Sequence, residues 1–307
     1  MLFTVGSRGD MVKAIQRIVG VSDDGVFGTG TEKAVRNWQK LHGLKVDGLV
    51  GRGTLGKMGL LDTDSSLIMS DINQASQLYT KDSYITHNNL EVFQYFMPTN
   101  EYHQGPIEPE WIFLHHTAGW HIPYNTIKYW DSDKNGAIGT EFVMGGQSVK
   151  GNDSNYDGEV VQAFPHKNWG YHLGDNGSQQ MHVHSIGMEV CNFGYVVNGK
   201  TWANVEVNDS QIVTLDRPFR GYSHWHRYSD NQLKSLQHWL KFIANRDNIN
   251  IREGLPQLIK DEGRKAFEFN IDAYQGQIKG VLTHTNTRKD KFDMFPQAEL
   301  MDMLIEL

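Results

Sequence analysis

Apolar residues in the first sixty positions recur three or four places apart in two stretches. The first stretch holds Met11, Ile15, Ile18 and Val19, and the second holds Ala34, Val35, Trp38 and Leu41. This spacing gathers the apolar side chains into one stripe along a helix. Thr29 and Glu32 stand in the pattern of a capping box before the second stretch. The pattern predicts a compact unit of about three short helices.

A short turn sequence occurs twice in the same region. DGVFG at positions 24–28 leads to Thr31, and DGLVG at positions 47–51 leads to Thr54. Each Asp-Gly pair is a turn signal, and each threonine stands where a helix could begin. The repeats flank a segment that reads AVxxWQKxxGL. The repeat predicts one turn-and-helix unit that is used twice.

This arrangement, from about Val5 to Leu61, resembles the peptidoglycan-binding domain type 1 found beside many cell-wall hydrolases. The resemblance implies that the unit binds bacterial peptidoglycan. Asp-Gly turns and an apolar stripe also suit a helical unit that has no ligand, so both readings stay open. The motif does not say which surface binds.

Beyond position 110 the apolar pattern changes to that of buried strands. Short apolar runs occur at 111–116 (WIFLHH), 142–144 (FVM), 159–164 and 185–192 (SIGMEVCN). Runs of this length that end at turn residues are typical of strands. Between them, Tyr124–Trp130 reads as a short helix. Farther on, Ser229 and Gln232 form a capping box before an amphipathic helix with Leu233, Leu236, Leu240 and Ile243.

Side chains along a strand alternate between its two faces. His115 should therefore share a face with Trp111 and Phe113, and His116 should point the other way. In the run at 185–192, Glu189 falls opposite the apolar residues Ile186, Met188 and Val190, on the same face as Cys191. A carboxylate among apolar neighbours needs a partner or a function.

Composition and charge exclude several classes of protein. The chain has 29 basic and 36 acidic residues, a net charge of −7, and no dense basic run, which excludes the footprint of a nucleic-acid binder. No apolar run approaches the roughly 20 residues of a membrane span. The start, MLFTVGSRGD, lacks the features of a signal peptide, so we expect synthesis in a host cytoplasm. With Cys191 as the single cysteine, a metal site must use mainly histidines and carboxylates.

Six segments occur in a characteristic order: FLHHTAG, GTEFVMGG, YDGEVVQAFP, WGYHLG, SIGMEV and THTNTRKDKFD. This order resembles the type 2 N-acetylmuramoyl-L-alanine amidases, which are zinc hydrolases common in phage endolysins and akin to peptidoglycan recognition proteins. The resemblance implies an α/β fold with a mixed central β-sheet flanked by helices, after a small N-terminal three-helix domain. The expected domains are 1–62 (peptidoglycan binding), 63–108 (a connector that packs across the next domain or acts as a spacer) and 109–307 (catalytic). A long insertion is expected near 196–277.

The same resemblance implies a zinc site and its ligands. His115, His284 and Asp293 would hold Zn²⁺, because the first histidine of the H-x-[ST]-A run and the later H and K-x-D positions carry the metal in that family. The chain departs from the family after the last ligand, where Met294-Phe295-Pro296 replaces the usual proline-glycine. This departure puts the shape of the loop in doubt.

Catalytic roles follow from the resemblance in the same way. Glu189 would be the general base, with Glu141 as the alternative. Lys291 would neutralise the oxyanion, with Arg288 or Lys289 as alternatives if the loop register differs.

Further residues are expected to contact the substrate or to stay outside the site. The expected substrate contacts are His116, Thr140, Trp169 and His172. Some relatives use a catalytic tyrosine where this chain has Thr140. The pairs His182-x-His184 and His224-x-His226 lack a third ligand at a persuasive spacing, so they read as surface or cleft histidines. Cys191 reads as a core residue.

The implied activity is hydrolysis of the amide between N-acetylmuramic acid and L-alanine of the stem peptide. The implied setting is that of a phage endolysin, a bacteriolytic enzyme that degrades the host cell wall during lysis. Two alternatives remain open at this point: a non-catalytic peptidoglycan recognition protein and a virion-associated wall hydrolase. No nucleic-acid partner and no membrane insertion are expected.

Overall fold

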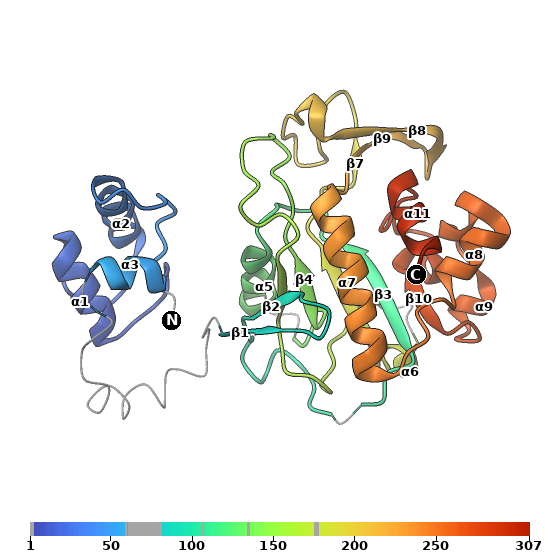
Figure 1. The fold of residues 1–307 in the computed structure, drawn as a ribbon, viewed down its shortest axis with the longest axis horizontal. Coiled ribbons are helices and arrows are strands. Elements are labelled where there is room, and N and C mark those ends of the chain that lie inside the picture. Colours follow the sequence, from blue (N-terminus) through green and yellow to red (C-terminus); the bar gives the residue numbers. More distant parts are fainter. Residues whose placement is uncertain (1–2, 59, 61–81, 106, 134–135, 175–177) are drawn as a thin grey trace. The chain divides into compact units, whose positions relative to one another are not determined.

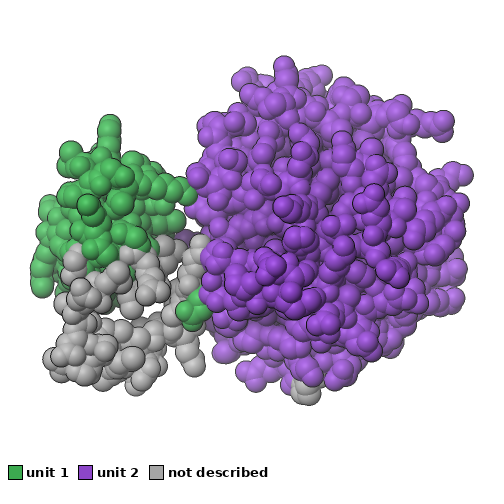
Figure 2. Space-filling model, in the orientation of Figure 1, with its two compact units in different colours: residues 1–82 green, residues 83–307 purple. Residues whose placement is uncertain are grey.

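The computed structural model describes residues 3–58, 60, 82–105, 107–133, 136–174 and 178–307, and Figure 1 shows its fold. The chain divides into two compact units, residues 1–82 and residues 83–307 (Figure 2). The predicted pair of a small helical unit and a larger α/β unit is confirmed.

Three helices form the first unit: α1 (Asp10–Val19), α2 (Thr29–Leu41) and α3 (Arg52–Lys57). Their apolar stripes meet in one core, whose fully buried members are Val12, Ile15, Phe27, Val35, Val50 and Leu55. The predicted capping box of Thr29 and Glu32 is wrong. Helix α2 begins directly after Gly28, and no side chain caps it. Gly51 precedes α3 with nearly the same backbone angles, so the glycine that closes each turn sets the helix start.

The repeated turns are held by a buried glutamine eight residues before each aspartate. The amide nitrogen of Gln16 donates to Asp24 (2.8 Å), to the Val26 carbonyl (3.0 Å) and to the Thr31 hydroxyl (3.1 Å). Its amide oxygen accepts from the backbone N–H of Gly25 (2.9 Å). The side chain is 1% exposed, and both ends of its amide are hydrogen-bonded. The motif is thus part of a satisfied internal network.

Gln39 repeats this set of contacts in the second turn. Its nitrogen donates to Asp47 (2.8 Å) and to the Leu49 carbonyl (2.7 Å), and its oxygen accepts from the N–H of Gly48 (2.9 Å). Thr54 lies at 3.4 Å and takes the place of Thr31. The internal repeat is therefore a repeat of hydrogen bonding as well as of sequence.

A seven-stranded sheet forms the centre of the second unit. In spatial order its strands are β1 (Asp82–Ile85), β2 (Glu91–Gln94), β5 (Val160–Gln162), β4 (Phe142–Met144), β6 (Ser185–Val190), β3 (Trp111–His116) and β10 (Gly280–Thr283). Strands β4, β6, β3 and β10 run parallel, and β5 runs antiparallel to β4. The sheet is therefore mixed, and the strands expected at 111–116, 142–144, 159–164 and 185–192 are confirmed.

Two apolar layers cover the two faces of β3. Ile112 and Leu114 pack in the large core, and Trp111 and Phe113 pack in a separate cluster with Leu173 and Met181. Alternation along the strand is as predicted, and it carries His115 to the face of Trp111 and Phe113. The helix α5 (Pro123–Ser132), expected at 124–130, follows the turn after β3.

Helix α7 (Asp230–Asp247) lies across the sheet in Figure 1. The predicted capping box is confirmed, because the Ser229 hydroxyl accepts from the N–H of Gln232 (3.0 Å) and the Gln232 side chain accepts from the N–H of Ser229 (3.1 Å). Leu236 and Leu240 of this helix are buried against the sheet core. The expected insertion at 196–277 thus contains a principal core helix.

The remaining elements surround this core. A three-stranded sheet is formed by β7 (Tyr195–Val196), β9 (Tyr222–His226) and β8 (Ile212–Phe219). The shorter elements are α6 (Gln179–Val183), η1 (Asp209–Gln211), α8 (Leu255–Glu262), η2 (Gly263–Phe267), α9 (Ile271–Tyr274), α10 (His284–Thr287) and α11 (Ala298–Ile305). Among the residues described, no helix has the length and apolar character needed to cross a bilayer.

The boundary of the second unit differs from the expected one. Strands β1 and β2 lie inside the expected connector 63–108, and they extend the central sheet. Residues 83–108 therefore belong to the second unit, and 61–81 lie outside the described residues. β1 is an edge strand, and both strands have only four residues, of which Val92 alone is buried. Such short strands give little apolar pattern, and this explains why the sequence looks like that of a linker.

Candidate active site

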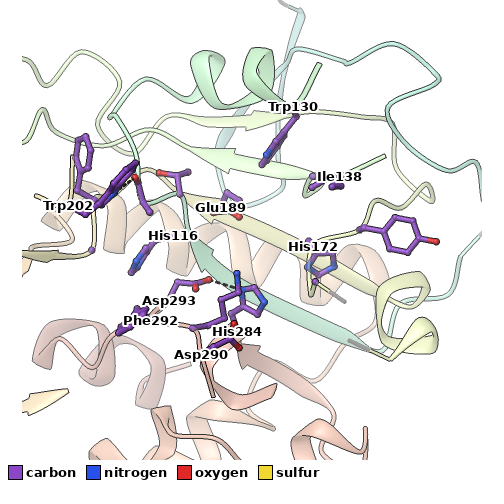
Figure 3. A pocket seen from close by; sticks show the side chains of 18 of the residues that line it. His116, Trp130, Ile138, His172, Glu189, Trp202, His284, Asp290, Phe292 and Asp293 are labelled. Carbon is purple, nitrogen blue, oxygen red and sulfur yellow. Dashed lines mark hydrogen bonds and ion pairs between the residues drawn. The ribbon is translucent and has the colours of Figure 1, made fainter. Parts of the chain in front are cut away.

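Three buried donor groups meet at one end of the central sheet. His115 is the penultimate residue of β3, His284 opens α10 directly after β10, and Asp293 lies in the following loop. The two Nδ1 atoms are 3.2 Å apart, and Asp293 Oδ2 lies 3.2 Å from His115 Nδ1 and 3.1 Å from His284 Nδ1. Parallel pairing of β3 with β10 brings together residues that are 169 positions apart. Figure 3 shows His284 and Asp293 beside the cavity.

The spacing of these atoms suits a zinc ion. Zinc binds histidine nitrogen and carboxylate oxygen at about 2.0–2.1 Å in tetrahedral sites, which separates any two ligand atoms by roughly 3.3–3.4 Å. The observed separations of 3.1–3.2 Å are close to this value. In the part of the chain that the structure describes, this is the one group of three or more potential metal ligands that converge. The predicted ligands are therefore brought together.

The charge states of these groups also suit a metal. Burial lowers the pKa of His115 to about 4, which keeps the imidazole neutral at neutral pH. Burial opposes the ionisation of Asp293, but the adjacent His284 and His115 outweigh it and hold the pKa of the carboxyl well below its ordinary value. A neutral imidazole and an ionised carboxylate are the forms that bind metal.

His172 contacts the predicted metal ligand His115. Its Nδ1 is 3.0 Å from His115 Nε2, and its own Nε2 is 2.8 Å from the Ser185 hydroxyl. If His115 binds metal through Nδ1, its Nε2–H donates to His172, which then donates to Ser185. Such contacts fix the orientation and tautomer of a ligand histidine. His172 also lines the cavity, so its position fits both this role and the expected substrate contact.

Glu189 lies beside the predicted metal ligand His115, on the neighbouring strand β6. In the parallel register of β3 and β6 it pairs with His115, so both side chains project from the same face. Its Oε2 is buried and has no hydrogen-bond partner in the described structure. Burial, with a contribution from the Asp293 charge, raises the pKa of the Glu189 carboxyl well above its ordinary value. Perturbation of this kind marks a candidate proton-transfer group.

Glu141, the alternative base, is engaged elsewhere. Its two carboxylate oxygens accept from Arg246 at 2.8 and 3.1 Å, and Gln162 donates to it at 2.8 Å. It is 3% exposed and is not among the residues that line the cavity. Glu141 therefore ties β4 to α7.

Residues 288–291 (RKDK), all of which the structure describes, include three cationic side chains. Of these three, Lys291 lines the cavity. Arg288 donates to the Leu173 carbonyl at 3.1 Å and to Asp290 at 2.7 and 2.8 Å. Lys289 lies over the ring of Phe269. The loop register thus favours Lys291 over both alternatives.

The four expected substrate contacts divide into two groups. His116 lines the cavity, as does His172, and its Nδ1 is 2.9 Å from the Tyr228 hydroxyl. Thr140 is 1% exposed and donates to the Phe142 carbonyl, so its position does not support substrate contact. Trp169 stacks on the ring of His103 at 4.1 Å and does not line the cavity. Tyr171, two residues later, lies there in its place.

The remaining histidines and the cysteine have local roles. His182 lines the cavity, and His184 contacts the Glu108 carbonyl (2.8 Å). His224 contacts Thr214 (2.9 Å), and His226 accepts from the N–H of Phe193 (3.2 Å). Cys191 is fully buried, as expected of a core residue, and burial raises the pKa of its thiol to about 12.

An aromatic stack that the sequence did not predict lies two residues after Asp293 in the chain. The ring of Phe295 lies between Trp225 and Tyr228, with ring centres 4.6 Å from each. Gln297 bonds the backbone of Tyr228 in both directions, at 2.8 and 3.0 Å. Both aromatic partners come from the segment expected as an insertion. The residues at 294–296, where the chain departs from the family pattern, thus include one that contacts the segment 196–277. A single sequence does not reveal such a contact.

The cavity in front of the metal ligands has a volume of about 870 Å³. Glu189, Lys291, His284 and Asp293 line it, together with the aromatic residues Trp130, Tyr171, Phe193, Tyr195, Trp202 and Phe292. In Figure 3, Trp202 and His172 lie on opposite sides of Glu189. This size admits a ligand as large as a short saccharide or peptide.

Comparison with known proteins gives one family match. Residues 8–58 match the family described as "Putative peptidoglycan binding domain". This agrees with the resemblance noted for residues 5–61. Among curated proteins, no sequence matches the chain.

Solved structures similar to the chain include PlyL and two endolysins. PlyL is 14% identical, with 64% of this chain and 82% of that chain covered and a TM-score of 0.35. A mutant endolysin from Bacillus subtilis is 18% identical, with 53% and 80% covered and a TM-score of 0.33. The endolysin N-acetylmuramoyl-L-alanine amidase LysCS from Clostridium intestinale is 13% identical, with 66% and 86% covered and a TM-score of 0.34. Both the identities and the scores are low.

Proposed function

We propose that this protein is a zinc-dependent peptidoglycan hydrolase that cleaves the amide between N-acetylmuramic acid and L-alanine. The observation that carries the proposal is the convergence of His115, His284 and Asp293 beside Glu189, whose buried Oε2 has no hydrogen-bond partner in the described structure. Two histidines and a carboxylate are a ligand set of zinc hydrolases. The family match of residues 8–58 supports peptidoglycan as the substrate. The order of motifs from FLHHTAG to THTNTRKDKFD supports the particular amide.

The donors fit zinc, so His115, His284 and Asp293 would hold it. When bound, zinc supplies Lewis acidity, which polarises a carbonyl and lowers the pKa of water. Glu189 accepts the proton of the attacking water through its free Oε2. Its raised pKa lets it return that proton to the leaving amine of alanine at near-neutral pH. The amide C–N bond breaks, a carboxylate forms on the lactyl group, and an amino terminus is released.

Lys291 supplies a positive charge at the cavity wall. A cation or hydrogen-bond donor aimed at the oxygen of the scissile carbonyl stabilises the tetrahedral intermediate, and one such donor typically contributes about 10²–10³ in rate. Tyr171 and His172 line the cavity as candidate substrate contacts. The same chemistry would serve an endolysin during host lysis or a virion-associated enzyme. The resemblance favours the endolysin, which acts on the cell wall.

The test combines metal content with product analysis. Purified full-length protein should contain one zinc ion per chain, and it should release alanine amino termini from peptidoglycan without reducing sugars. Asp293→Ala should lose both the zinc and the activity, whereas Asp209→Ala, an exposed change in η1, should lose neither. New reducing ends in place of amino termini would contradict the amidase. An intact protein that binds peptidoglycan but holds no zinc would point to a recognition protein.

A further inference from the structure

The loop between β7 and η1 places one exposed tryptophan at the rim of the cavity. Trp202 is 60% exposed and lines the cavity. Its indole N–H donates to the carbonyl of Ala118 at 2.8 Å. Ala118 belongs to the Thr-Ala-Gly turn that directly follows the metal-binding end of β3. The exposed ring is thus tied to the backbone of the active site.

The loop that carries Trp202 has a defined backbone structure. Val197 and Lys200 exchange two backbone hydrogen bonds, at 2.9 and 3.0 Å, and the N–H of Thr201 donates to the Val205 carbonyl at 2.9 Å. Val205 packs against a buried apolar cluster that includes Phe193 and Val207. The structure of this loop therefore keeps the large apolar ring of Trp202 exposed to solvent, although burial of such a ring is favourable in free energy.

The cavity wall near Trp202 is uncharged. The lining residues contributed by the Thr-Ala-Gly turn, by the segment after β6 and by this loop are Thr117, Ala118, Phe193, Gly194, Tyr195 and Trp202. Of the charged lining residues, Asp290, Lys291 and Asp293 come from the loop after α10, and Glu189 comes from β6. In Figure 3, Trp202 and Asp290 lie on opposite sides of Asp293. The two sides of the cavity therefore offer different chemistry.

An uncharged aromatic wall suits a saccharide better than a stem peptide. Because the indole N–H is already used, Trp202 offers a ligand mainly its ring, and a flat aromatic surface packs well on the C–H face of a pyranose. A stem peptide carries carboxylates, which would be recognised by charged groups. We infer that Trp202 forms a saccharide subsite that binds the glycan strand of peptidoglycan at a sugar next to the N-acetylmuramic acid that carries the cleaved amide. This inference rests on the proposed function and names the part of the substrate that each side of the cavity takes.

The first test compares two soluble substrates that share one stem peptide. One carries a single N-acetylmuramic acid, and the other carries a chain of alternating N-acetylglucosamine and N-acetylmuramic acid. The full-length, zinc-loaded protein should show a higher kcat/KM on the longer substrate. Trp202→Ala should remove this advantage, about a tenfold effect through KM, and leave the single-sugar substrate unchanged.

Two further variants make the comparison specific. Tyr129→Ala removes an aromatic ring of similar exposure (67%) that does not line the cavity, and it should keep the advantage. Trp202→Phe keeps an aromatic ring but loses the hydrogen bond to Ala118. Its KM on the longer substrate should therefore fall between that of the unchanged protein and that of Trp202→Ala. An equal loss on both substrates in Trp202→Ala would overturn the inference, because it would show that the ring serves the stem peptide or the shape of the site.

The second test separates this inference from the proposed function. Peptide-free tetrasaccharide of the same glycan contains no amide to cleave, so its binding can be measured by calorimetry whatever bond the protein hydrolyses. The full chain should bind it about tenfold more tightly than Trp202→Ala does, and the first unit contributes equally to both titrations. Equal affinity would overturn the subsite even if the amidase activity is found. A retained difference without amidase activity would support the subsite and contradict the proposed function.

Discussion

Each of the two units buries a polar cluster, and the two clusters differ in how far their atoms are satisfied. In the first unit both ends of the Gln16 and Gln39 amides are hydrogen-bonded to the repeated turns. In the second unit Glu189 keeps a buried oxygen without a partner, next to the converging metal ligands. A satisfied buried group specifies structure, whereas an unsatisfied one costs stability and persists where chemistry needs it.

The largest expected effect distinguishes the two clusters directly. Glu189→Gln should lower kcat by about 10²–10⁴, because the proton acceptor is lost. It should leave the free energy of unfolding unchanged or slightly higher, since a buried carboxyl without a partner is replaced by a neutral amide. Enzyme assay and thermal unfolding of the same zinc-loaded sample measure both quantities.

Glu141→Gln is the matched control for this variant. It removes the charge that pairs with Arg246, so it should destabilise the second unit by about 1–3 kcal/mol. Its kcat per folded molecule should stay near that of the unchanged protein. The reverse pattern, with activity lost in Glu141→Gln and kept in Glu189→Gln, would exchange the roles of the two carboxylates.

The next effect concerns the aromatic stack behind the metal ligands. Phe295→Ala should destabilise the second unit by about 3–5 kcal/mol, because a fully buried ring between Trp225 and Tyr228 is lost. It should also weaken zinc binding by about 10–100-fold, because Asp293 lies two residues before it. Leu240→Ala in the same core should lower stability and leave zinc affinity as it was. Equal zinc affinity in both variants would show that the stack does not hold the ligand.

A smaller effect is expected in the first unit. Gln39→Ala leaves the N–H of Gly48 and the carbonyl of Leu49 without their partner, which should cost about 1–3 kcal/mol of that unit's stability. Binding to intact cell wall should weaken as this unit unfolds, and hydrolysis of a soluble substrate should not change. Lys40→Ala, an exposed change next to it, serves as the control. A loss of activity on the soluble substrate would show that the first unit takes part in catalysis.

A further effect is a difference in pH dependence. Burial lowers the pKa of His226 to about 3 and of His116 to about 4, against about 6.5 in an unfolded chain. The unfolded state therefore takes up protons first as the pH falls, so the second unit should lose stability from about pH 6.5 down to about pH 4. The one histidine of the first unit, His42, is exposed. Calorimetry of metal-free protein should show the unfolding temperature of the second unit falling relative to that of the first unit as the pH is lowered. His226→Asn should make the unfolding temperature of the second unit less dependent on pH.

Sequence patterns over a few neighbouring positions predicted the features that depend on those positions alone. Alternation along 111–116 separated His115 from His116, and the Ser229–Gln232 capping box marked the start of α7. The same type of motif failed at Thr29, because the glycine that closes the preceding turn determines where α2 begins. The strands β1 and β2 escaped notice because each has only four residues, of which Val92 alone is buried.

The sequence predicted those site residues that a residue type at a motif position identifies. It did not predict the side chains whose direction depends on packing. Resemblance selected His115, His284, Asp293, Glu189 and Lys291. The structure places the last four at one cavity, and it places His115 against His284 and Asp293. The resemblance also suggested Thr140 and Trp169, which the structure turns away from that cavity. The direction of a loop side chain depends on the neighbours it packs against, and these come from distant segments.

The sequence by itself therefore determined the helical repeat, the strands, the faces of those strands and the kinds of metal-ligating group available, because these depend on neighbours a few positions away. Only the tertiary structure decided that residues 169 positions apart share one point in space. It also decided that Phe295 is held by Trp225 and Tyr228, and that Trp202 lies at the cavity. Contacts of this range arise from the parallel pairing of strands and the packing of the whole core, which no local pattern encodes.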